Sequence, residues 1–177
     1  IKMNNIKNIL VIGGSGFIGS YLIKSLISEK NNVINFDIKK SNINSNKLRN
    51  VVGNVKNTED FNKLEGFFDI VYILAAEHKD NLNNVNKYYE TNHHGMINIL
   101  KFCNQKLLEN IVFYSSAAVY GNNFTGASET NDDLKPLNHY GKSKRLAENE
   151  LKHWVLDKEN RKLIIIRPSV VYGIGSK

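Results

Sequence analysis

Short apolar runs, rich in β-branched residues, recur along the whole chain. They lie at residues 9–12, 33–36, 51–52, 70–74, 111–114 and 163–166. Each run is nearly continuously apolar and does not alternate with polar positions, which is typical of strands covered on both faces of a parallel sheet. The pattern therefore predicts six strands at these positions.

The segments between these runs have helical spacing. Apolar residues recur three and four positions apart over residues 18–26 and again over residues 96–107. Strands that alternate with helices favour a doubly wound α/β fold, in which a parallel sheet carries helices on both faces. Residues 39–50, rich in Asn and Ser, are predicted to form a loop. No change of composition marks a domain boundary, so residues 1–177 are predicted to form one domain.

Composition narrows the classes of function. Of the 177 residues, 41% are hydrophobic and 23% are charged, which is the balance of a compact globular protein. The net charge is +7, but the lysines are spread along the chain without a dense basic block. We therefore expect an affinity for anionic small molecules and no nucleic-acid surface. No apolar stretch approaches the length of a membrane span, so no membrane partner is expected.

Cys103 is the only cysteine and lies inside a helical pattern. It cannot form a disulfide within the chain, and we interpret it as a small buried apolar residue. A reducing compartment fits this composition, and the first residues lack the apolar core of a signal peptide. We therefore expect a cytoplasmic protein.

Glycines follow the first predicted strand at positions 13, 16 and 19, where the first helical pattern begins. Glycine at this spacing allows a tight turn and a close approach of the backbone to a diphosphate, while the free N–H groups of the helix start face the anion. The second strand ends in Asp37, whose carboxylate can accept hydrogen bonds from the ribose hydroxyls of adenosine and would repel a 2′-phosphate. We predict that NAD binds here in preference to NADP, a preference that Lys39 and Lys40 weaken.

Tyr140 and Lys144 lie four residues apart in a helical segment and therefore share one face of it. An ammonium group close to a phenol stabilises the phenolate and lowers the pKa of the phenol. The tyrosine can then take a proton from a sugar or alcohol hydroxyl. His93 and His94 are adjacent and face different sides of a helix, so no metal site is predicted.

The order of these and further motifs resembles the extended short-chain dehydrogenase/reductase family, in particular its NAD-dependent epimerases and dehydratases that act on nucleotide sugars. The resemblance covers essentially the whole chain and implies a Rossmann-type sheet with NAD as cofactor. Its motifs, in sequence order, are Gly13-x-x-Gly16-x-x-Gly19, Asp37, Gly53-Asn54-Val55, Leu74-Ala75-Ala76, Tyr88-x-x-x-Asn92-x-x-Gly95-x-x-Asn98, Ser115-Ser116-x-x-Val119-Tyr120-Gly121, Tyr140-x-x-x-Lys144 and Arg167-Pro168-x-x-Val171-Tyr172-Gly173.

The resemblance implies roles for individual residues. Ser116 is implied to position the substrate hydroxyl, Tyr140 to act as acid and base, and Lys144 to tune Tyr140 and hold the nicotinamide ribose. Asn54 stands where the family often has Asp. His139 stands where it usually has a small residue or Pro, and we expect it to shape the loop. The residues implied to bind the cofactor are Gly13, Ser15, Gly16, Phe17, Ile18, Gly19, Asp37, Ile38, Asn54, Val55, Leu74, Ala75, Ala76, Asn92, Tyr140 and Lys144.

Two alanines narrow the implied reaction. Sugar 4,6-dehydratases of this family carry an Asp-Glu pair after the serine, whereas this chain has Ala117 and Ala118, which cannot transfer protons. The resemblance therefore implies a nucleotide-sugar epimerase that transiently oxidises C4 of a UDP-hexose. A keto-sugar reductase that uses NAD(P)H and a non-catalytic NAD-binding module are the alternatives.

Relatives in this family continue past the Arg167-Pro168 motif into a smaller region that holds the nucleotide sugar. The resemblance therefore implies that the 177 residues are the cofactor domain of a longer enzyme, with little or no activity of their own. Family members often pair as homodimers through two helices, which correspond here to residues 88–107 and 141–156. A nucleotide-sugar substrate and a second copy of the chain are the expected partners.

Overall fold

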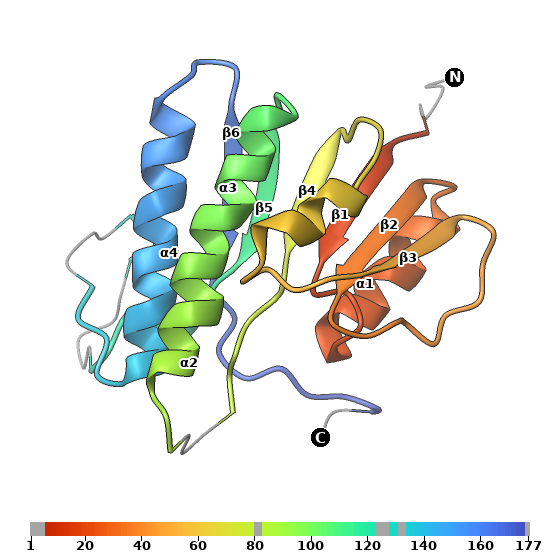
Figure 1. Cartoon of the computed structure of the whole chain (residues 1–177). Helices are drawn as coiled ribbons and strands as arrows, with labels where there is room; N and C mark the ends of the chain where they lie inside the picture. The colour runs from red at the N-terminus through yellow and green to blue at the C-terminus, as the bar shows by residue number, and fades with distance from the viewer. Residues whose placement is uncertain (1–5, 80–82, 123–127, 131–133, 176–177) are drawn as a thin grey trace.

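A parallel sheet of six strands forms the centre of the molecule (Figure 1). The computed structural model of the chain describes residues 6–79, 83–122, 128–130 and 134–175. Within them the strand order is β3-β2-β1-β4-β5-β6, and every neighbouring pair is parallel. The strands are β1 (Asn8–Ile12), β2 (Asn32–Asp37), β3 (Leu48–Val52), β4 (Ile70–Ile73), β5 (Asn110–Tyr114) and β6 (Lys162–Ile166).

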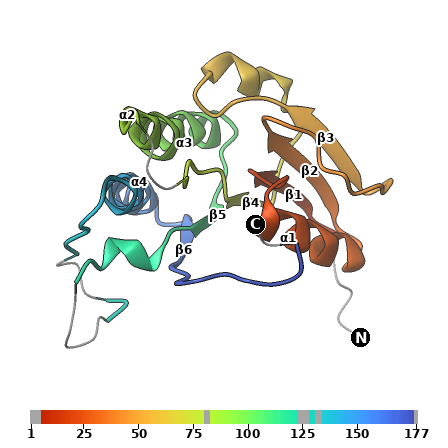
Figure 2. The same cartoon turned by 90° about the horizontal axis from the view of Figure 1, so that it is seen from below.

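Helices cover both faces of this sheet, with α1 on one side and α3 and α4 together on the other (Figure 2). The α-helices are α1 (Phe17–Ser28), α2 (Asn86–Tyr88), α3 (Gly95–Gln105) and α4 (His139–Leu156), and the shorter elements are the 3-10 turns η1 (Thr58–Lys63) and η3 (Ala117–Val119) and the π-helical turn η2 (Tyr89–His94). The predicted doubly wound, Rossmann-type fold is confirmed. None of the helices in the described ranges is long and apolar enough to cross a membrane.

The six predicted strands are all present, but one predicted loop and one helix end differ. The loop predicted over residues 39–50 is wrong at its end, because Leu48 and Arg49 already pair with Val33 and Ile34 of β2. β3 lies at the edge of the sheet, where a strand tolerates polar side chains. A search for apolar runs therefore misses the first residues of this strand. Leu107, the last residue of the predicted apolar period, lies beyond α3 with a positive φ of 54°.

Two hydrophobic clusters hold the layers together. The larger one packs the sheet against α3, α4 and η1, and it includes the ring contacts of Phe61 with Phe36 and with Phe102. The smaller one packs the other face of β1 and β2 against Ile23 and Leu26 of α1. Successive residues of β1 point to opposite faces, and each face is covered by one of the two clusters. All four residues Ile9–Ile12 are therefore buried, as the continuous apolar run predicts.

The carboxyl ends of β1, β2, β4 and β5 lie at one edge of the sheet and carry the predicted site residues. β1 is central, and the chain turns from it toward β2 on one side and returns as β4 on the other. Ligands of doubly wound sheets bind at such a switch in strand order. After β6 the chain runs across this edge to α1, where the Tyr21 hydroxyl donates to the Ile174 carbonyl at 2.8 Å (Figure 2).

The turn after β1 predicts a large effect of a small substitution. Gly13 has a φ of +86°, and a Cβ built on it would lie 2.3 Å from the backbone nitrogen of Ala75. Gly66 has nearly the same φ, +87°, with no atom within 4 Å of its Cβ position among the described residues. We expect Gly66→Ala to cost about 1 kcal/mol of unfolding free energy and Gly13→Ala about 3 kcal/mol or more.

Urea unfolding of both variants measures this difference. Because the two glycines have nearly the same φ, the excess loss in Gly13→Ala reports the contact between the turn and the segment after β4. Equal losses in the two variants would contradict this interpretation.

Candidate active site

The glycine-rich turn between β1 and α1 is shaped by close backbone contacts. The Gly13 amide donates to the Phe36 carbonyl at 2.8 Å, and a Cβ on Gly19 would lie 2.6 Å from the Cα of Gly14. Gly16 is the N-cap of α1, and none of the described side chains caps this helix end. The first N–H groups of α1 are therefore available to an anion, and they suit the diphosphate of a dinucleotide.

The side chain of Asn35 in β2 holds the glycine-rich turn in place through hydrogen bonds. Asn35 was not predicted as a site residue. Its side chain is fully buried in β2, where Oδ1 accepts from the Gly14 amide at 3.1 Å. Its Nδ2 donates to Ser15 Oγ and to Asn50 Oδ1, both at 2.9 Å. The signal was visible in the sequence, since a polar residue at the centre of an apolar strand must find hydrogen-bond partners.

Asp37, predicted to bind the adenosine ribose, ends β2 beside the same turn. Its Oδ2 accepts from the Ser15 amide at 2.9 Å and its Oδ1 from the Lys39 amide at 3.2 Å. Ser15 Oγ in turn donates to the Lys39 carbonyl at 2.7 Å. The carboxylate is thus fixed at the edge of the glycine-rich turn, and the neighbouring Ile38 is exposed.

The segment after β4 lies against the glycine-rich turn, as the close approach of Ala75 to Gly13 shows. Leu74 and Ala75 both donate from their backbone amides to the Ile12 carbonyl, at 2.8 and 2.9 Å. Ala76, the third predicted residue here, follows them and is half-buried. The structure therefore brings the predicted residues after β1 and β4 together.

Asn54, Val55 and Asn92 are predicted cofactor residues whose side chains the protein itself uses. Asn54 Oδ1 accepts from the Lys56 amide at 3.0 Å, and the Val55 side chain is buried in the larger cluster. Asn92, buried in the π-helical turn η2, accepts from the Glu77 amide at 2.8 Å. It also donates to the Glu77 carbonyl at 3.0 Å and to Ser143 Oγ at 2.9 Å. Asn92 therefore ties the segment after β4 to α4, and contact of these three residues with a cofactor stays a prediction.

Tyr140 and Ser116 are brought together by the start of α4. Asn138 caps this helix by accepting from the Gly141 amide at 2.7 Å. Gly141 approaches η3 so closely that a Cβ would lie 2.5 Å from the Ala118 carbonyl oxygen. Burial raises the pKa of the Tyr140 phenol, and its hydrogen bond with the Ser116 side chain acts in the opposite direction.

Lys144, one turn after Tyr140, is 1% exposed. Its Nζ donates to the Tyr114 carbonyl at 2.5 Å and lies 4.3 Å from the centre of the Phe113 ring. Burial lowers the pKa of Lys144 to about 7, and the charge of Glu148 opposes this shift. The sequence predicts that Lys144 lowers the pKa of Tyr140, but the net shift of Tyr140 is upward because its own burial dominates.

His139 and His93 form contacts between η2 and α4. His139 begins α4, is exposed, and its Nδ1 lies 2.9 Å from the Tyr89 hydroxyl, so it joins η2 to the start of α4. His93 Nε2 lies 3.1 Å from Glu150 Oε1 across the same two elements. The described residues contain no group of three or more side chains placed to hold a metal ion.

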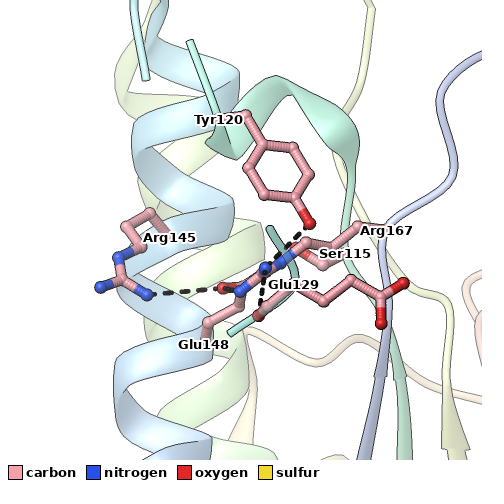
Figure 3. Close-up of polar contacts among 6 residues, drawn as sticks. All are labelled: Ser115, Tyr120, Glu129, Arg145, Glu148 and Arg167. Atoms are coloured by element: carbon pink, nitrogen blue, oxygen red, sulfur yellow. Dashed lines mark hydrogen bonds and ion pairs between the residues drawn. The ribbon is translucent and has the colours of Figure 1, made fainter. Parts of the chain in front are cut away.

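Figure 3 shows a polar cluster around Glu148 of α4. Glu148 is fully buried and forms an ion pair with Arg167, the residue that follows β6, at 2.8 Å. Ser115, the residue before Ser116, donates to the same carboxylate at 2.5 Å. Glu148 was not predicted as a site residue, although its spacing of four from Lys144 places it on the helix face of that lysine.

The chain matches a known protein family over most of its length. The model of the NAD dependent epimerase/dehydratase family matches residues 9–177. The chain belongs to this family. The family resemblance and the use of NAD that the motifs imply are thereby confirmed.

Relatives of the epimerase/dehydratase family agree with this assignment. The chain is 38% identical, over 94% of its length, to the N-acetyl-α-D-glucosaminyl-diphospho-ditrans,octacis-undecaprenol 4-epimerase of Escherichia coli O157:H7, and it covers 49% of that protein. The UDP-Glc/GlcNAc 4-epimerase structure from Campylobacter jejuni matches 91% of the chain with a TM-score of 0.80 and 25% identity, and 53% of its own chain is covered.

A third relative, the structure of MoeE5 in complex with UDP-glucose and NAD, matches 89% of the chain with a TM-score of 0.70 and 28% identity. The match covers 52% of the MoeE5 chain. The chain therefore spans about half the length of the epimerase/dehydratase relatives that it matches.

The role of Asn35 in this family member predicts a linked loss of stability and of NAD binding. Asn35→Leu keeps the size of the side chain but leaves the buried Gly14 amide without its acceptor. We expect a loss of about 2–3 kcal/mol of unfolding free energy and an NAD dissociation constant raised about tenfold or more. Calorimetric titration with NAD and urea unfolding measure the two effects.

Asn32→Leu is the matched control, since Asn32 lies on the same strand at the opposite, exposed end. It should leave NAD binding unchanged and stability within about 0.5 kcal/mol. Tight NAD binding by Asn35→Leu would show that the turn holds its shape without this side chain.

The buried Lys144 predicts that stability rises with pH. Its pKa is about 7 in the folded chain and ordinarily 10.5. The unfolded chain therefore binds more protons between these values, and the free energy of unfolding increases with pH by up to about 1.4 kcal/mol per unit. The clear window is pH 7–9, because above it the raised pKa of Cys103, about 12, acts in the opposite direction.

Urea unfolding at pH 7, 8 and 9 tests this slope. Lys144→Met should remove it, whereas Lys142→Met, which changes an exposed lysine of the same helix, should retain it. The same slope in Lys144→Met as in the unchanged chain would assign the pH dependence to other groups.

Proposed function

We propose that this chain is the cofactor-binding domain, residues 1–177, of a sugar-diphosphate 4-epimerase that uses NAD. The observation that carries the proposal is the close approach of the start of α4, with Tyr140 and the buried Lys144, to the turn that begins at Ser116, where a Cβ on Gly141 would lie 2.5 Å from the Ala118 carbonyl oxygen. A hydroxyl, a phenol and an amine at the carboxyl edge of a doubly wound sheet form a proton-transfer site beside the switch in strand order. The names of the relatives, two of which are 4-epimerases, support this choice of reaction.

The residues divide into those that hold NAD and those that handle the substrate. The turn from Gly13 to Gly19 would bind the diphosphate, and Asp37 the adenosine ribose. The chemistry that NAD supplies when bound is reversible oxidation at C4 of the sugar.

The chain's own residues would move the proton. Tyr140 takes the proton of the C4 hydroxyl and later returns it, so no net proton is consumed. Ser116 orients the sugar hydroxyl toward Tyr140. Lys144, whose pKa is about 7, holds the nicotinamide ribose and lies close to its protonation midpoint at neutral pH.

Two other reactions of the family are less well supported by these residues. A dehydratase needs an acid and a base after the serine, but Ala117 and Ala118 form η3 there. A keto-sugar reductase would consume reduced cofactor in proportion to product, which an assay of NADH consumption distinguishes. A non-catalytic NAD-binding module would have no use for the contact between Ser116 and Tyr140.

Two groups are candidates for the diphosphate carrier to which the substrate sugar is attached. One related structure is a UDP-Glc/GlcNAc 4-epimerase, and another is a complex with UDP-glucose. The relative from Escherichia coli O157:H7 is named for a sugar joined through a diphosphate to undecaprenol. Both carriers present a hexose on a diphosphate, and a comparison of UDP-N-acetylglucosamine with the undecaprenyl-diphosphate form identifies the preferred one.

We also propose a homodimer that pairs through residues 88–107 and 141–156, and a cytoplasmic location. The expectation of a reducing compartment agrees with the buried Cys103 thiol, whose pKa is raised to about 12 by burial, so that it does not react as a thiolate.

Tyr140→Phe tests the proposed reaction on the protein at its full length. The variant keeps the ring but loses the group that accepts the proton, so we expect turnover of UDP-hexose pairs to fall at least about 100-fold, with NAD binding retained. Interconversion is followed without added reductant, since epimerisation has no net redox change.

Tyr89→Phe is the matched control. This variant removes a tyrosine hydroxyl that contacts His139 at the start of α4, the helix that carries Tyr140, and we expect it to retain turnover. Unchanged turnover in Tyr140→Phe would remove the proposed mechanism, and net consumption of NADH would favour the reductase.

A further inference from the structure

Glu148 is the most deeply buried carboxylate of the cluster in Figure 3, and both of its oxygens are occupied. Oε1 accepts from the Ser115 hydroxyl at 2.5 Å and from Nε of Arg167 at 3.0 Å. Oε2 accepts from the second Arg167 nitrogen at 2.8 Å and lies 3.6 Å from Arg145. The guanidinium of Arg167 thus binds this carboxylate through two parallel hydrogen bonds.

Arg167 extends the cluster to a third segment. Its remaining nitrogen donates to the Tyr120 hydroxyl at 3.0 Å and to the Glu129 carbonyl at 3.3 Å. The guanidinium carbon lies 5.0 Å from the centre of the Tyr120 ring. One ion pair therefore joins α4, the ends of β5 and β6, and the residue after η3.

Stability alone does not account for such a pair. Burying two charges is costly, and apolar side chains of similar volume often replace a buried ion pair without loss of stability. Apolar side chains, however, cannot form directional hydrogen bonds that fix the position of a neighbouring polar group. The hydrogen bonds of Glu148 fix the position of one particular hydroxyl, that of Ser115.

Ser115 and Ser116 contact α4 at two separate points. Ser115 binds Glu148, whereas the turn after Ser116 meets Gly141, which lies seven residues and therefore about 10 Å earlier along the helix, next to Tyr140. The Ser115 amide is also held, donating to the Ile166 carbonyl at 2.7 Å. Two contacts at different positions along the helix restrict its sliding along the strand end.

We propose that the Glu148–Arg167 ion pair is a positioning element, which holds Ser116 against Tyr140 by anchoring the adjacent Ser115. Both residues act through their neighbours and touch no reacting atom. The inference rests on the proposed function in one respect only, the assignment of Ser116 and Tyr140 to catalysis. Their contact, and what maintains it, can be measured without turnover.

The test replaces both charges at once. In Glu148→Leu/Arg167→Met both members of the bidentate pair are removed together and the local net charge is unchanged, so the 177-residue chain should stay folded although Arg145 loses its 3.6 Å contact with Glu148. Tyr140 is followed by NMR in protein labelled with ¹³C at the tyrosine ζ carbon, and its signal is assigned from Tyr140→Phe. Above pH 9 Lys144 is uncharged, so it does not disturb the titration of the phenol.

We expect the titration midpoint of Tyr140 to rise by about half to one pH unit in the double variant. The Ser116 hydrogen bond lowers the pKa of this phenol, and losing one hydrogen bond shifts a pKa by about that amount. The NMR contact between the Ser116 β-protons and the Tyr140 ring should weaken at neutral pH as well.

Arg161→Met is the matched control for general loosening of α4. Arg161 is a second buried arginine, which donates to the Trp154 carbonyl at 2.7 Å and to Asn104 at 2.7 Å, at the far end of the same helix. Its loss should reduce stability and leave the midpoint of Tyr140 unchanged. An equal rise in both variants would overturn the proposal, because it would show that any loosening of α4 has this effect.

An unchanged midpoint in a folded double variant would also overturn the proposal. If the double variant fails to fold, Ser115→Ala removes only the contact with Glu148 and decides the question in the same way. Because the measurement needs no substrate, an inactive or differently specific enzyme would refute the proposed function without affecting this result.

Discussion

The close approach of α4 to the end of β5 is the constraint on which the candidate site depends. Gly141 lies so near the Ala118 carbonyl that any side chain at this position would collide with backbone. Lys144 and Glu148 follow on the same helix face and bind the carbonyl of Tyr114 and the hydroxyl of Ser115. A glycine, a lysine and a glutamate on three successive turns thus set the distance between Tyr140 and the strand end.

The same face carries charged groups that are costly to bury, and each is compensated locally. Lys144 has a carbonyl and the Phe113 ring as partners, and Glu148 has Arg167. Hydrogen bonds with Glu148 raise the pKa of Arg167, so this pair stays ionised. Among the described residues Lys144 has no such bidentate partner, and its pKa falls instead. The fold thereby keeps one fixed charge pair and one amine that titrates near neutral pH.

The apolar and glycine patterns of the sequence predict the strands and the motifs. They do not predict contacts between residues that lie far apart in the sequence. The apolar runs predict all six strands because both faces of a parallel sheet are covered. Leu48 of β3 escapes this rule because an edge strand needs no continuous run. The partners of Asn35 and of Glu148 depend on which loops meet at the sheet edge. The upward pKa shift of Tyr140 depends on burial that a spacing of four residues does not reveal.

The stretch from Ser115 to Ala118 shows why two hydroxyls precede two alanines. Ser115 is used by the protein itself, since its hydroxyl donates to Glu148. The Ser116 oxygen accepts from the Ala118 amide at 3.1 Å, so its proton remains available for Tyr140. A hydrogen bond donated to a phenol oxygen favours the phenolate, which is the direction that Ser116 acts on Tyr140. The alanines contribute backbone: the Ala117 amide binds the Pro168 carbonyl, and the Ala118 carbonyl backs Gly141. Small side chains at these two positions let one turn orient the serine and receive the helix at the same time.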